Sequence, residues 1–344
     1  MMRASKVIAG GSRRFAGGLL VELAATLRDA RDGDLIAISS DLEEVGEDLA
    51  AWSRLTGHAI VSGDPAAGAH RWVVRKGAGQ LDVEPPRPIG SRLWLYTNFD
   101  CNLRCDYCCV RSSPATERRE LGLSQVTRIA AEAAELGTVE SLFITGGEPL
   151  LLPDIADIVA TCAAAAPTTV LTNGMLLQGA RLERLRALPR DRVAYQISVD
   201  SATPDLHDLH RGSGSWKKAM RGVQAARDAG FRVRLAATVS SDADEASFRE
   251  FLDREGIAEE DRLVRRIALR GFATDGVALA KSDLVPEVTL TAAGVYWHPV
   301  GATDADFLVR ASLFPLAEAI DAVVAHWRSE RQHHETLAQI FHCA

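Results

Sequence analysis

The stretch Cys101-Asn102-Leu103-Arg104-Cys105-Asp106-Tyr107-Cys108 carries more chemical information than any other part of this sequence. It places three thiols at C-x3-C-x2-C spacing, directly after the apolar, strand-like run 93–96. A [4Fe–4S] cube held by cysteine usually takes four thiolates, so three cysteines on one loop can ligate three irons and leave the fourth iron open. The spacing therefore predicts an iron–sulfur site with one position free for another ligand.

A structural zinc site and simple burial are the two alternatives for these cysteines. A structural zinc ion takes four nitrogen or sulfur ligands, usually from two C-x2-C pairs separated along the chain. No second pair follows in this sequence, which has 6 cysteines in all. Iron–sulfur chemistry therefore accounts better for the spacing.

With the aromatic Tyr107 before its third cysteine, this motif resembles the signature of the radical S-adenosylmethionine (radical SAM) enzymes. The resemblance extends to Gly146-Gly147-Glu148-Pro149, which follows the strand-like run 141–145. In that family such a turn binds the amino group of S-adenosylmethionine. The residue types suit this role, because glycines let the backbone pass close to a ligand and a carboxylate can pair with an ammonium. Proline then fixes the exit into the next helix.

Further segments resemble the same family where predicted strands end. They are the turn Thr172-Asn173-Gly174, the pair Ser198 and Asp200, and the segment His210-Arg211-Gly212. The resemblance implies that Ser198 and Asp200 contact the methionine carboxylate or the ribose. It implies that Arg211 holds the carboxylate of S-adenosylmethionine and that Tyr107 lies against the adenine. The alternative for Arg211 is a surface arginine in a loop, and the alternative for Tyr107 is an aromatic side chain that serves only in packing.

Composition is that of an ordinary globular protein, with 344 residues, 47% hydrophobic and 25% charged. The net charge of −7 gives no basic field that would favour nucleic acid. No apolar run is long enough for a membrane span, and the amino-terminal segment is no signal peptide. Four of the cysteines fall within nine positions, which indicates a reducing compartment rather than a disulfide framework. We therefore expect a cytoplasmic protein with neither nucleic acid nor membrane as partner.

Short β-type runs alternate with helical runs between about residues 93 and 269. The β-type runs are 93–98, 139–145, 168–172, 192–199, 231–239 and 263–269. The helical runs lie near 123–136, 153–166, 178–188, 215–229 and 244–255. Such alternation predicts an α/β fold with a parallel sheet, and the family resemblance makes it an open (β/α)6 partial TIM barrel over residues 92–285. Every motif above lies at the carboxyl end of a predicted strand, where barrel enzymes place their chemistry.

The first 80 residues form a separate small α+β unit, followed by a Pro-rich linker over 81–91. Helices over 19–30 and 45–56, a strand over 35–39 and two later strands resemble the TusA/SirA-like sulfur carriers. Those carriers begin their first helix with Cys-Pro, and this chain has Ala16-Gly17-Gly18 there. Because no cysteine precedes Cys101, persulfide chemistry is excluded. A docking or binding role and a purely structural role remain.

Residues 286–344 resemble the SPASM/twitch auxiliary-cluster extension of peptide-modifying radical SAM enzymes, as a short α+β extension. His298 precedes Pro299 where that extension normally has a cysteine, and Cys343 is the one cysteine in the region. We expect an extension that has lost its cluster, with iron ligation by His298 and Cys343 as the alternative. His333, His334 and His342 are interpreted as polar surface residues, and Cys109 and Cys162 as non-ligands.

The family resemblance implies a mechanism. Cys101, Cys105 and Cys108 hold one [4Fe–4S] cluster, whose open iron binds S-adenosylmethionine. An electron donor, flavodoxin or ferredoxin, drives cleavage to methionine and a 5′-deoxyadenosyl radical that abstracts hydrogen from a substrate. The substrate is either a ribosomal peptide, with the amino-terminal unit as docking domain, or a small metabolite as in cofactor biosynthesis. A non-catalytic iron–sulfur sensor is the third hypothesis, and the retained Gly-Gly-Glu-Pro turn argues against it.

Overall fold

The computed structural model of the chain describes residues 6–13, 15, 19–28, 30–31, 33–56, 58–66, 69–77, 87–279, 281 and 284–340. The chain divides into two compact units, residues 1–88 with 335–344 and residues 89–334. The predicted linker at 81–91 falls at this division, although residues 81–86 lie outside the described part. Among the described helices, none has the length and apolar character needed to cross a membrane.

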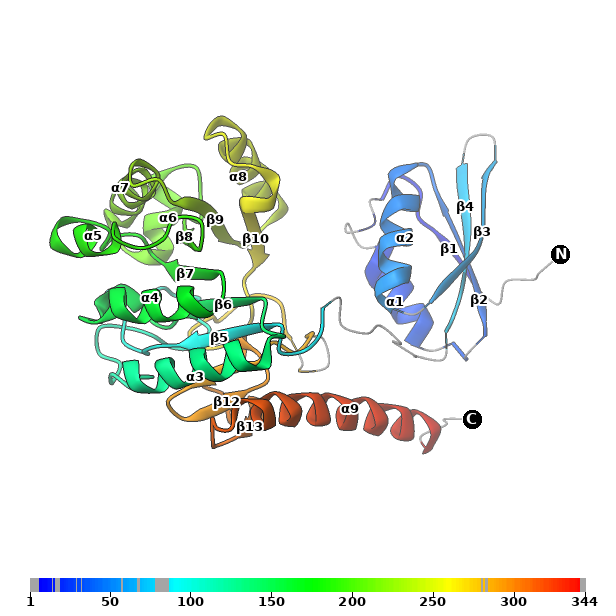
Figure 1. Cartoon of the computed structure of the whole chain (residues 1–344). Coiled ribbons are helices and arrows are strands. Elements are labelled where there is room, and N and C mark those ends of the chain that lie inside the picture. Colours follow the sequence, from blue (N-terminus) through cyan, green and yellow to red (C-terminus); the bar gives the residue numbers. More distant parts are fainter. Residues whose placement is uncertain are drawn as a thin grey trace. The chain divides into compact units, whose positions relative to one another are not determined.

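The amino-terminal unit is a two-layer α+β fold in which two helices cover a four-stranded sheet (Figure 1). Its elements are β1 (Lys6–Ala9), α1 (Leu20–Arg28), β2 (Leu35–Ser40), α2 (Glu44–Thr56), β3 (Ala59–Ala66) and β4 (Ala69–Arg75). The sheet order is β1-β2-β4-β3, with β1 parallel to β2 and the other pairs antiparallel. Both predicted helices and the later strands are thus present in this unit.

The core of this unit follows from the spacing of its apolar residues. Leu23 and Leu27 lie one turn apart on one face of α1, and Leu19, just before the helix, continues this four-residue spacing; all three are buried. Ile36 and Ile38 alternate along β2 and pack into the same core. Strand β1 was not predicted, because it is four residues long and buries only Ile8. A strand with one buried side chain has no alternating pattern to detect.

The larger unit is built on a nine-stranded sheet with the order β10-β9-β8-β7-β6-β5-β11-β12-β13. Six strands follow one another in chain order and pair in parallel, as predicted. They are β5 (Arg92–Tyr96), β6 (Ser141–Thr145), β7 (Thr168–Thr172), β8 (Val193–Ser198), β9 (Arg232–Val239) and β10 (Arg262–Arg266). The sheet is open rather than closed, because β10 ends it on one side. This arrangement agrees with a partial barrel.

A helix follows each of the first five parallel strands (Figure 1). The helices are α3 (Leu123–Leu136), α4 (Ile155–Ala165), α5 (Gly179–Leu185), α6 (Pro204–Arg211), α7 (Ser215–Asp228) and α8 (Asp242–Arg254). Helix α3 ends as predicted at Gly137, which adopts a left-handed φ of 64°. Helix α8 begins with a capping box between Ser241 and Asp244.

Helix α6 contains Arg211, for which one of the two interpretations was a surface arginine in a loop. Arg211 is the last residue of α6, and Pro204 begins the helix at a position where proline is well tolerated. The helix is short and polar, so its sequence shows little apolar periodicity. Its charged residues contact neighbouring loops instead of a core.

The carboxy-terminal extension widens the barrel sheet. Strands β11 (Thr289–Thr291) and β12 (Gly294–Tyr296) form the expected strand pair, and β13 (Leu308–Arg310) follows. Strand β11 pairs in parallel with β5, so the extension continues the sheet beyond its first strand. A long helix, α9 (Leu316–Ile340), comes last. That the extension shares a sheet with the core was not predicted from the sequence.

Candidate functional site

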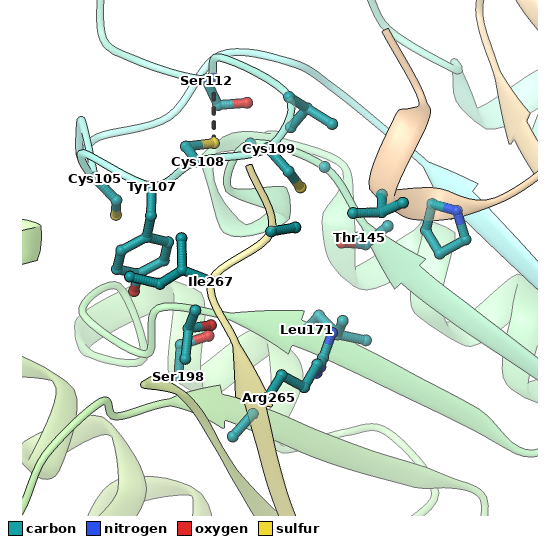
Figure 2. A pocket seen from close by; sticks show the side chains of 18 of the residues that line it. Cys105, Tyr107, Cys108, Cys109, Ser112, Thr145, Leu171, Ser198, Arg265 and Ile267 are labelled. Atoms are coloured by element: carbon teal, nitrogen blue, oxygen red, sulfur yellow. Dashed lines mark hydrogen bonds between the residues drawn. The ribbon is translucent and has the colours of Figure 1, made fainter. Parts of the chain in front are cut away.

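A cavity of about 580 Å³ lies at the carboxyl ends of the parallel strands. All six strands β5–β10 contribute lining residues, and residues 298–300 of the extension complete the wall. In a parallel α/β sheet the carboxyl ends of the strands are where ligands bind. Figure 2 shows the cysteine loop on one side of this cavity and β10 on another.

Most of the predicted site residues face this one cavity. Those that line it are Cys101, Cys105, Cys108, Tyr107, Gly146, Gly147, Asn173, Ser198 and Arg211. Three others, Glu148, Pro149 and Asp200, are buried behind its wall. Residues far apart in the sequence are thus brought to a single site, because each follows a different strand of the same sheet.

The cysteine loop presents its sulfurs in a polar setting. The backbone N–H of Leu103 donates to Sγ of Cys101 at 3.4 Å. The N–H of Ser112 donates to Sγ of Cys108, also at 3.4 Å (Figure 2). Hydrogen bonds to cysteine sulfur adjust the potential of a bound iron–sulfur cluster. Burial raises the pKa of the free Cys105 thiol to about 11, so the thiolate needs a metal to form near neutral pH.

The donor set suits a cluster better than a single ion. Within the described ranges, no three His, Cys, Asp or Glu side chains converge closely enough to hold one metal ion. In a cubane each cysteine binds a different iron, so the three sulfurs need not meet at one point. Three thiols on one loop of a cavity therefore fit a [4Fe–4S] cluster with one open iron.

The Gly-Gly-Glu-Pro turn is joined to the start of the cysteine loop by backbone hydrogen bonds. The N–H of Gly147 donates to the Asn98 carbonyl at 2.9 Å, and the N–H of Glu148 donates to the Asp100 carbonyl at 3.0 Å. A Cβ on Gly147 would overlap the Asp100 carbonyl, and one on Gly146 would overlap Asn98. In the structure the two glycines allow the turn to pack against the start of the cysteine loop. From the sequence, we had expected them to let the backbone approach a ligand.

Glu148, predicted to pair with an ammonium group, has partners within the protein. Its side chain is fully buried, and its carboxylate accepts hydrogen bonds from Thr172 Oγ1 at 2.7 Å and the Asn173 N–H at 2.8 Å. It also accepts from the Leu150 N–H at 3.0 Å. Burial raises the pKa of this carboxyl group against the effect of these bonds. Glu148 therefore holds the β6 and β7 loops together, and only the backbone of Gly146 and Gly147 borders the cavity.

Asn173 connects the β7 loop to the cysteine loop. Its side-chain amide donates to Oδ1 of Asn102 at 2.8 Å, and its own Oδ1 accepts from the Met175 N–H at 3.0 Å. Asn102 lies between the first two cysteines of the motif. The position of Asn173 in the cavity wall is therefore fixed from two directions.

Asp200 and Arg211 form a buried ion pair behind Tyr107. Arg211 donates through Nε and Nη2 to the two carboxylate oxygens, at 2.5 and 3.1 Å, and the Tyr107 hydroxyl donates to Oδ2. Burial alone would raise the pKa of Asp200, but the charge of Arg211 and these hydrogen bonds hold it below its usual value. The side chain of Arg211 is 9% exposed. Arg211 is thus not a surface arginine, and Tyr107 has a specific polar partner.

Three residues of the cavity wall were either missed in the sequence or given another interpretation there. Arg265 of β10 and Gln196 of β8 line the cavity, and neither was singled out. Both residues lie inside predicted barrel strands, Arg265 in the run Arg265-Arg266 and Gln196 in an otherwise apolar strand. A charged or polar residue at such a position is the sequence feature that could have identified them as cavity residues. His298 also lines the cavity, and its Nδ1 accepts the Val300 N–H at 3.1 Å.

The structure describes two of the three remaining cysteines. Cys109 lines the cavity beside Cys108, whereas Cys162 is fully buried in α4 among apolar residues. Cys343 and His342 lie outside the described residues, so the suggested pairing of His298 with Cys343 stays a prediction. The side chains of His333 and His334 are also outside the described part.

Comparisons with known proteins agree with this geometry. Residues 95–254 match the family model of the radical SAM superfamily. The GTP 3′,8-cyclase of Yersinia pestis is 36% identical over 160 residues, which cover 44% of this chain and 47% of that protein. The AdoMet-dependent heme synthase of Methanosarcina barkeri is 34% identical over 142 residues, covering 41% of this chain and 40% of that protein. The chain thus spans about half the length of the first of these relatives.

A solved structure, native anSMEcpe with bound AdoMet, has the same fold. The two chains superpose with a TM-score of 0.52 at 12% sequence identity, over 67% of this chain and 80% of the other. The matched family region begins in β5 and ends with α8, so it contains the cysteine loop and the other predicted ligand loops. The part of the chain that carries the cysteine loop and the other predicted ligand loops, residues 95–254, thus matches the radical SAM superfamily, and its fold is that of a structure solved with bound AdoMet.

Proposed function

We propose that this protein cleaves S-adenosylmethionine reductively and uses the resulting radical to abstract hydrogen from a substrate held in the same cavity. The observation that carries the proposal is the gathering of the cysteine loop, the Gly-Gly turn, Ser198 and Arg211 around one cavity. When bound, the cluster supplies the electron that divides S-adenosylmethionine into methionine and a 5′-deoxyadenosyl radical. The electron comes from a flavodoxin or ferredoxin.

The chain's own residues bind and orient the cofactors in this proposal. Cys101, Cys105 and Cys108 hold three irons. The backbone of Gly146 and Gly147 borders the place of the amino group, while Glu148 keeps the turn in position. Ser198 and the remaining donors of Arg211 bind the carboxylate or ribose, with Asp200 fixing the guanidinium, because a bidentate partner leaves an arginine little freedom to rotate.

The test is the release of 5′-deoxyadenosine by the full chain after anaerobic cluster reconstitution, with dithionite as reductant. We expect release by the parent and by Cys162→Ala, whose thiol lies in the apolar core of α4. We expect none above the protein-free blank from Cys105→Ala. Release by Cys105→Ala at the parental rate would refute the cluster assignment, and no release by the parent would favour a non-catalytic iron–sulfur protein.

For the substrate, we favour a small metabolite over a ribosomal peptide. The relatives that match the core are named for a GTP cyclase and a heme synthase, both small-molecule activities. A peptide is the second candidate, because anSMEcpe has been solved with a bound peptide, although that likeness extends only to the fold. Deuterium transfer from a labelled substrate into 5′-deoxyadenosine distinguishes the two, since only the true substrate loses its deuterium to the radical.

For the amino-terminal unit, we propose a TusA/SirA-like domain that has lost its carrier cysteine and serves in binding. Its two layers and the sequence positions of its helices support this proposal, although residues 16–18, where the cysteine would stand, lie outside the described part. Crosslinking of the full chain to its substrate or electron donor should give crosslinks on residues 6–77. Crosslinks confined to residues 89–334 would favour a purely structural role.

A further inference from the structure

Arg265 is an arginine without an ionic partner inside the cavity. Neighbouring arginines are paired: Arg211 with Asp200, Arg266 with Asp242 and Glu245, and Arg270 with Asp304 at 2.6 Å. Among the described residues, no carboxylate forms an ion pair with Arg265, and its nearest ionisable neighbours are the Cys109 thiol and the Tyr96 phenol. The accessible surface of Arg265 opens into the cavity that it lines.

Arg265 is the most exposed residue of β10, and its side chain also lines the cavity. A guanidinium carries five N–H donors and a permanent positive charge, so without an ionic partner in the chain it can bind an anionic ligand. The guanidinium therefore marks a position where an anion from outside the chain is favoured.

Two further polar groups belong to the same wall, and we call Gln196, Arg265 and His298 the arginine side of the cavity. Gln196 is 3% exposed, lines the cavity, and its amide has no hydrogen-bond partner among the described residues. His298 uses Nδ1 to accept the Val300 N–H, so its neutral ring carries the proton on Nε2. That Nε2–H is a donor, which makes the ring better suited to an anionic oxygen than to iron.

The arrangement brings these groups towards one region. Figure 2 shows the side chain of Arg265 extending from β10 into the cavity towards Leu171 of β7. Leu171 is the register partner of Gln196 on the next strand. The positive charge of Arg265 also lowers the pKa of His298, after the larger effect of burial, so the guanidinium and imidazole are electrostatic neighbours. The apolar residues Leu171, Ile267 and Val277 line the same part of the cavity.

We propose that the arginine side binds an anionic oxygen group of the substrate, a carboxylate or a phosphate, with Arg265 as the charged anchor. Gln196 and the Nε2–H of His298 add hydrogen bonds, and the apolar wall receives the rest of the molecule. The inference rests on the proposed function, because it takes the cavity to be where the radical meets its substrate.

The experiment measures anion binding by isothermal titration calorimetry on the full, cluster-reconstituted chain saturated with S-adenosylmethionine. The probes are pyrophosphate for the phosphate class and succinate for the carboxylate class. The variants are Arg265→Gln and Arg265→Lys, and the matched control is Arg266→Gln, because Arg266 is the next residue on β10 but its guanidinium is already paired. We expect the parent and the control to bind at least one probe.

In Arg265→Gln the affinity should fall by about tenfold or more, as expected when a charged hydrogen-bond donor is lost. Arg265→Lys should recover part of the affinity, because the charge remains without the planar fork. A parent that binds neither probe, or an Arg265→Gln variant that binds as the parent does, would overturn the proposal. Failure of the proposed function would show separately, as absence of 5′-deoxyadenosine from the reduced parent.

Discussion

The two sides of the cavity differ in how their polar groups are paired. On the cysteine side, which comprises residues 98–113, the turn 146–149 and Asp200 with Arg211, the carboxylates of Asp100, Glu148 and Asp200 all have hydrogen-bond partners, whereas the buried Ser112 hydroxyl has none among the described residues. Arg118 binds Asp100 through Nε at 2.9 Å and Nη2 at 2.7 Å, and Asp106 accepts from His210 at 2.9 Å. On the arginine side, Arg265 and Gln196 face the cavity, and neither has a partner among the described residues. Paired groups keep their geometry before a ligand binds, whereas unpaired groups have donors and acceptors that a ligand can still satisfy.

This difference agrees with the two kinds of ligand that we propose. A cluster and S-adenosylmethionine are the same in every catalytic cycle, so a loop held by its own ion pairs and hydrogen bonds can be preorganised for them. A substrate enters and leaves, and its own groups complete the hydrogen bonding of the wall. Substitutions on the cysteine side should therefore lower either the iron content or the free energy of unfolding, and the loss should grow with the number of bonds that each substitution breaks.

The largest effect should follow from removing the cluster ligands. We predict about four irons per reconstituted chain, since three loop thiols support one cube. Replacement of Cys101, Cys105 and Cys108 together by alanine should abolish essentially all iron binding. Iron and sulfide analysis measures both quantities, with Cys109→Ala as control because Cys109 lines the same cavity. About eight irons in the parent and about four in the triple variant would show a second cluster in the carboxy-terminal region.

The next effect concerns the ion pair that supports the wall. Asp200→Asn keeps the shape of the side chain but leaves Arg211 as an unpaired buried charge. Loss of one partner of a buried ion pair typically costs about 3–5 kcal/mol. Urea unfolding of the apo protein, followed by circular dichroism, measures the change. Asp205→Asn is the control, because Asp205 is an exposed carboxylate in the first turn of α6. Equal losses in the two variants would mean that the pair does not brace the cysteine side.

A smaller effect should follow from crowding the contact between the two ligand loops. Gly147→Ala introduces a methyl group against the carbonyl of Asp100, in a place where the neighbouring atoms are backbone. Overpacking of this kind costs about 1–3 kcal/mol, and here it should also lower iron retention by displacing the cysteine loop. Gly122→Ala is the control, because a Cβ at Gly122 meets no atom within 4 Å. Full iron retention in Gly147→Ala would show that the turn and the loop move independently.

The strands and the residues of the cysteine side could be predicted from the sequence for a physical reason. A buried parallel strand is a short apolar run, and a ligand loop at its end has special residues at fixed spacing, so each signal is local. The roles of Glu148 and of the glycine pair were not accessible. They depend on contacts between loops that follow different strands, which no local pattern encodes.

Arg265 and α6 were missed for related reasons. An arginine inside a strand is typical of a surface residue unless the barrel is known to enclose a cavity. Helix α6 is eight residues long, and aspartate and histidine occupy half of its positions, so its apolar face is too narrow to detect. The edge strand β11 joins the sheet beside β5 although a long stretch of chain separates them, a pairing that only tertiary structure reveals.

The smallest effect concerns the pH dependence of stability on the braced side. His207 is 1% exposed, and its Nδ1 accepts the Asp200 N–H at 3.1 Å. Burial lowers the pKa of His207 from its ordinary value near 6.5 to about 4. Above pH 6.5 the ring is neutral in both the folded and the unfolded chain, so its contribution to stability is complete. As the pH falls towards 4, the unfolded chain binds a proton that the folded chain rejects, and this contribution is lost.

The parent should therefore lose stability between pH 6.5 and 4 more steeply than His207→Gln, by up to about 1.4 kcal/mol per pH unit from this one group. Urea unfolding of both apo proteins at pH 7, 6 and 5 measures the difference in their free energies of unfolding. The difference should be largest at pH 7 and should narrow as the pH falls, because glutamine does not titrate. A difference that stays constant would show that His207 takes up its proton in the folded state as easily as in water, and the wall behind Tyr107 would then be open to solvent rather than closed.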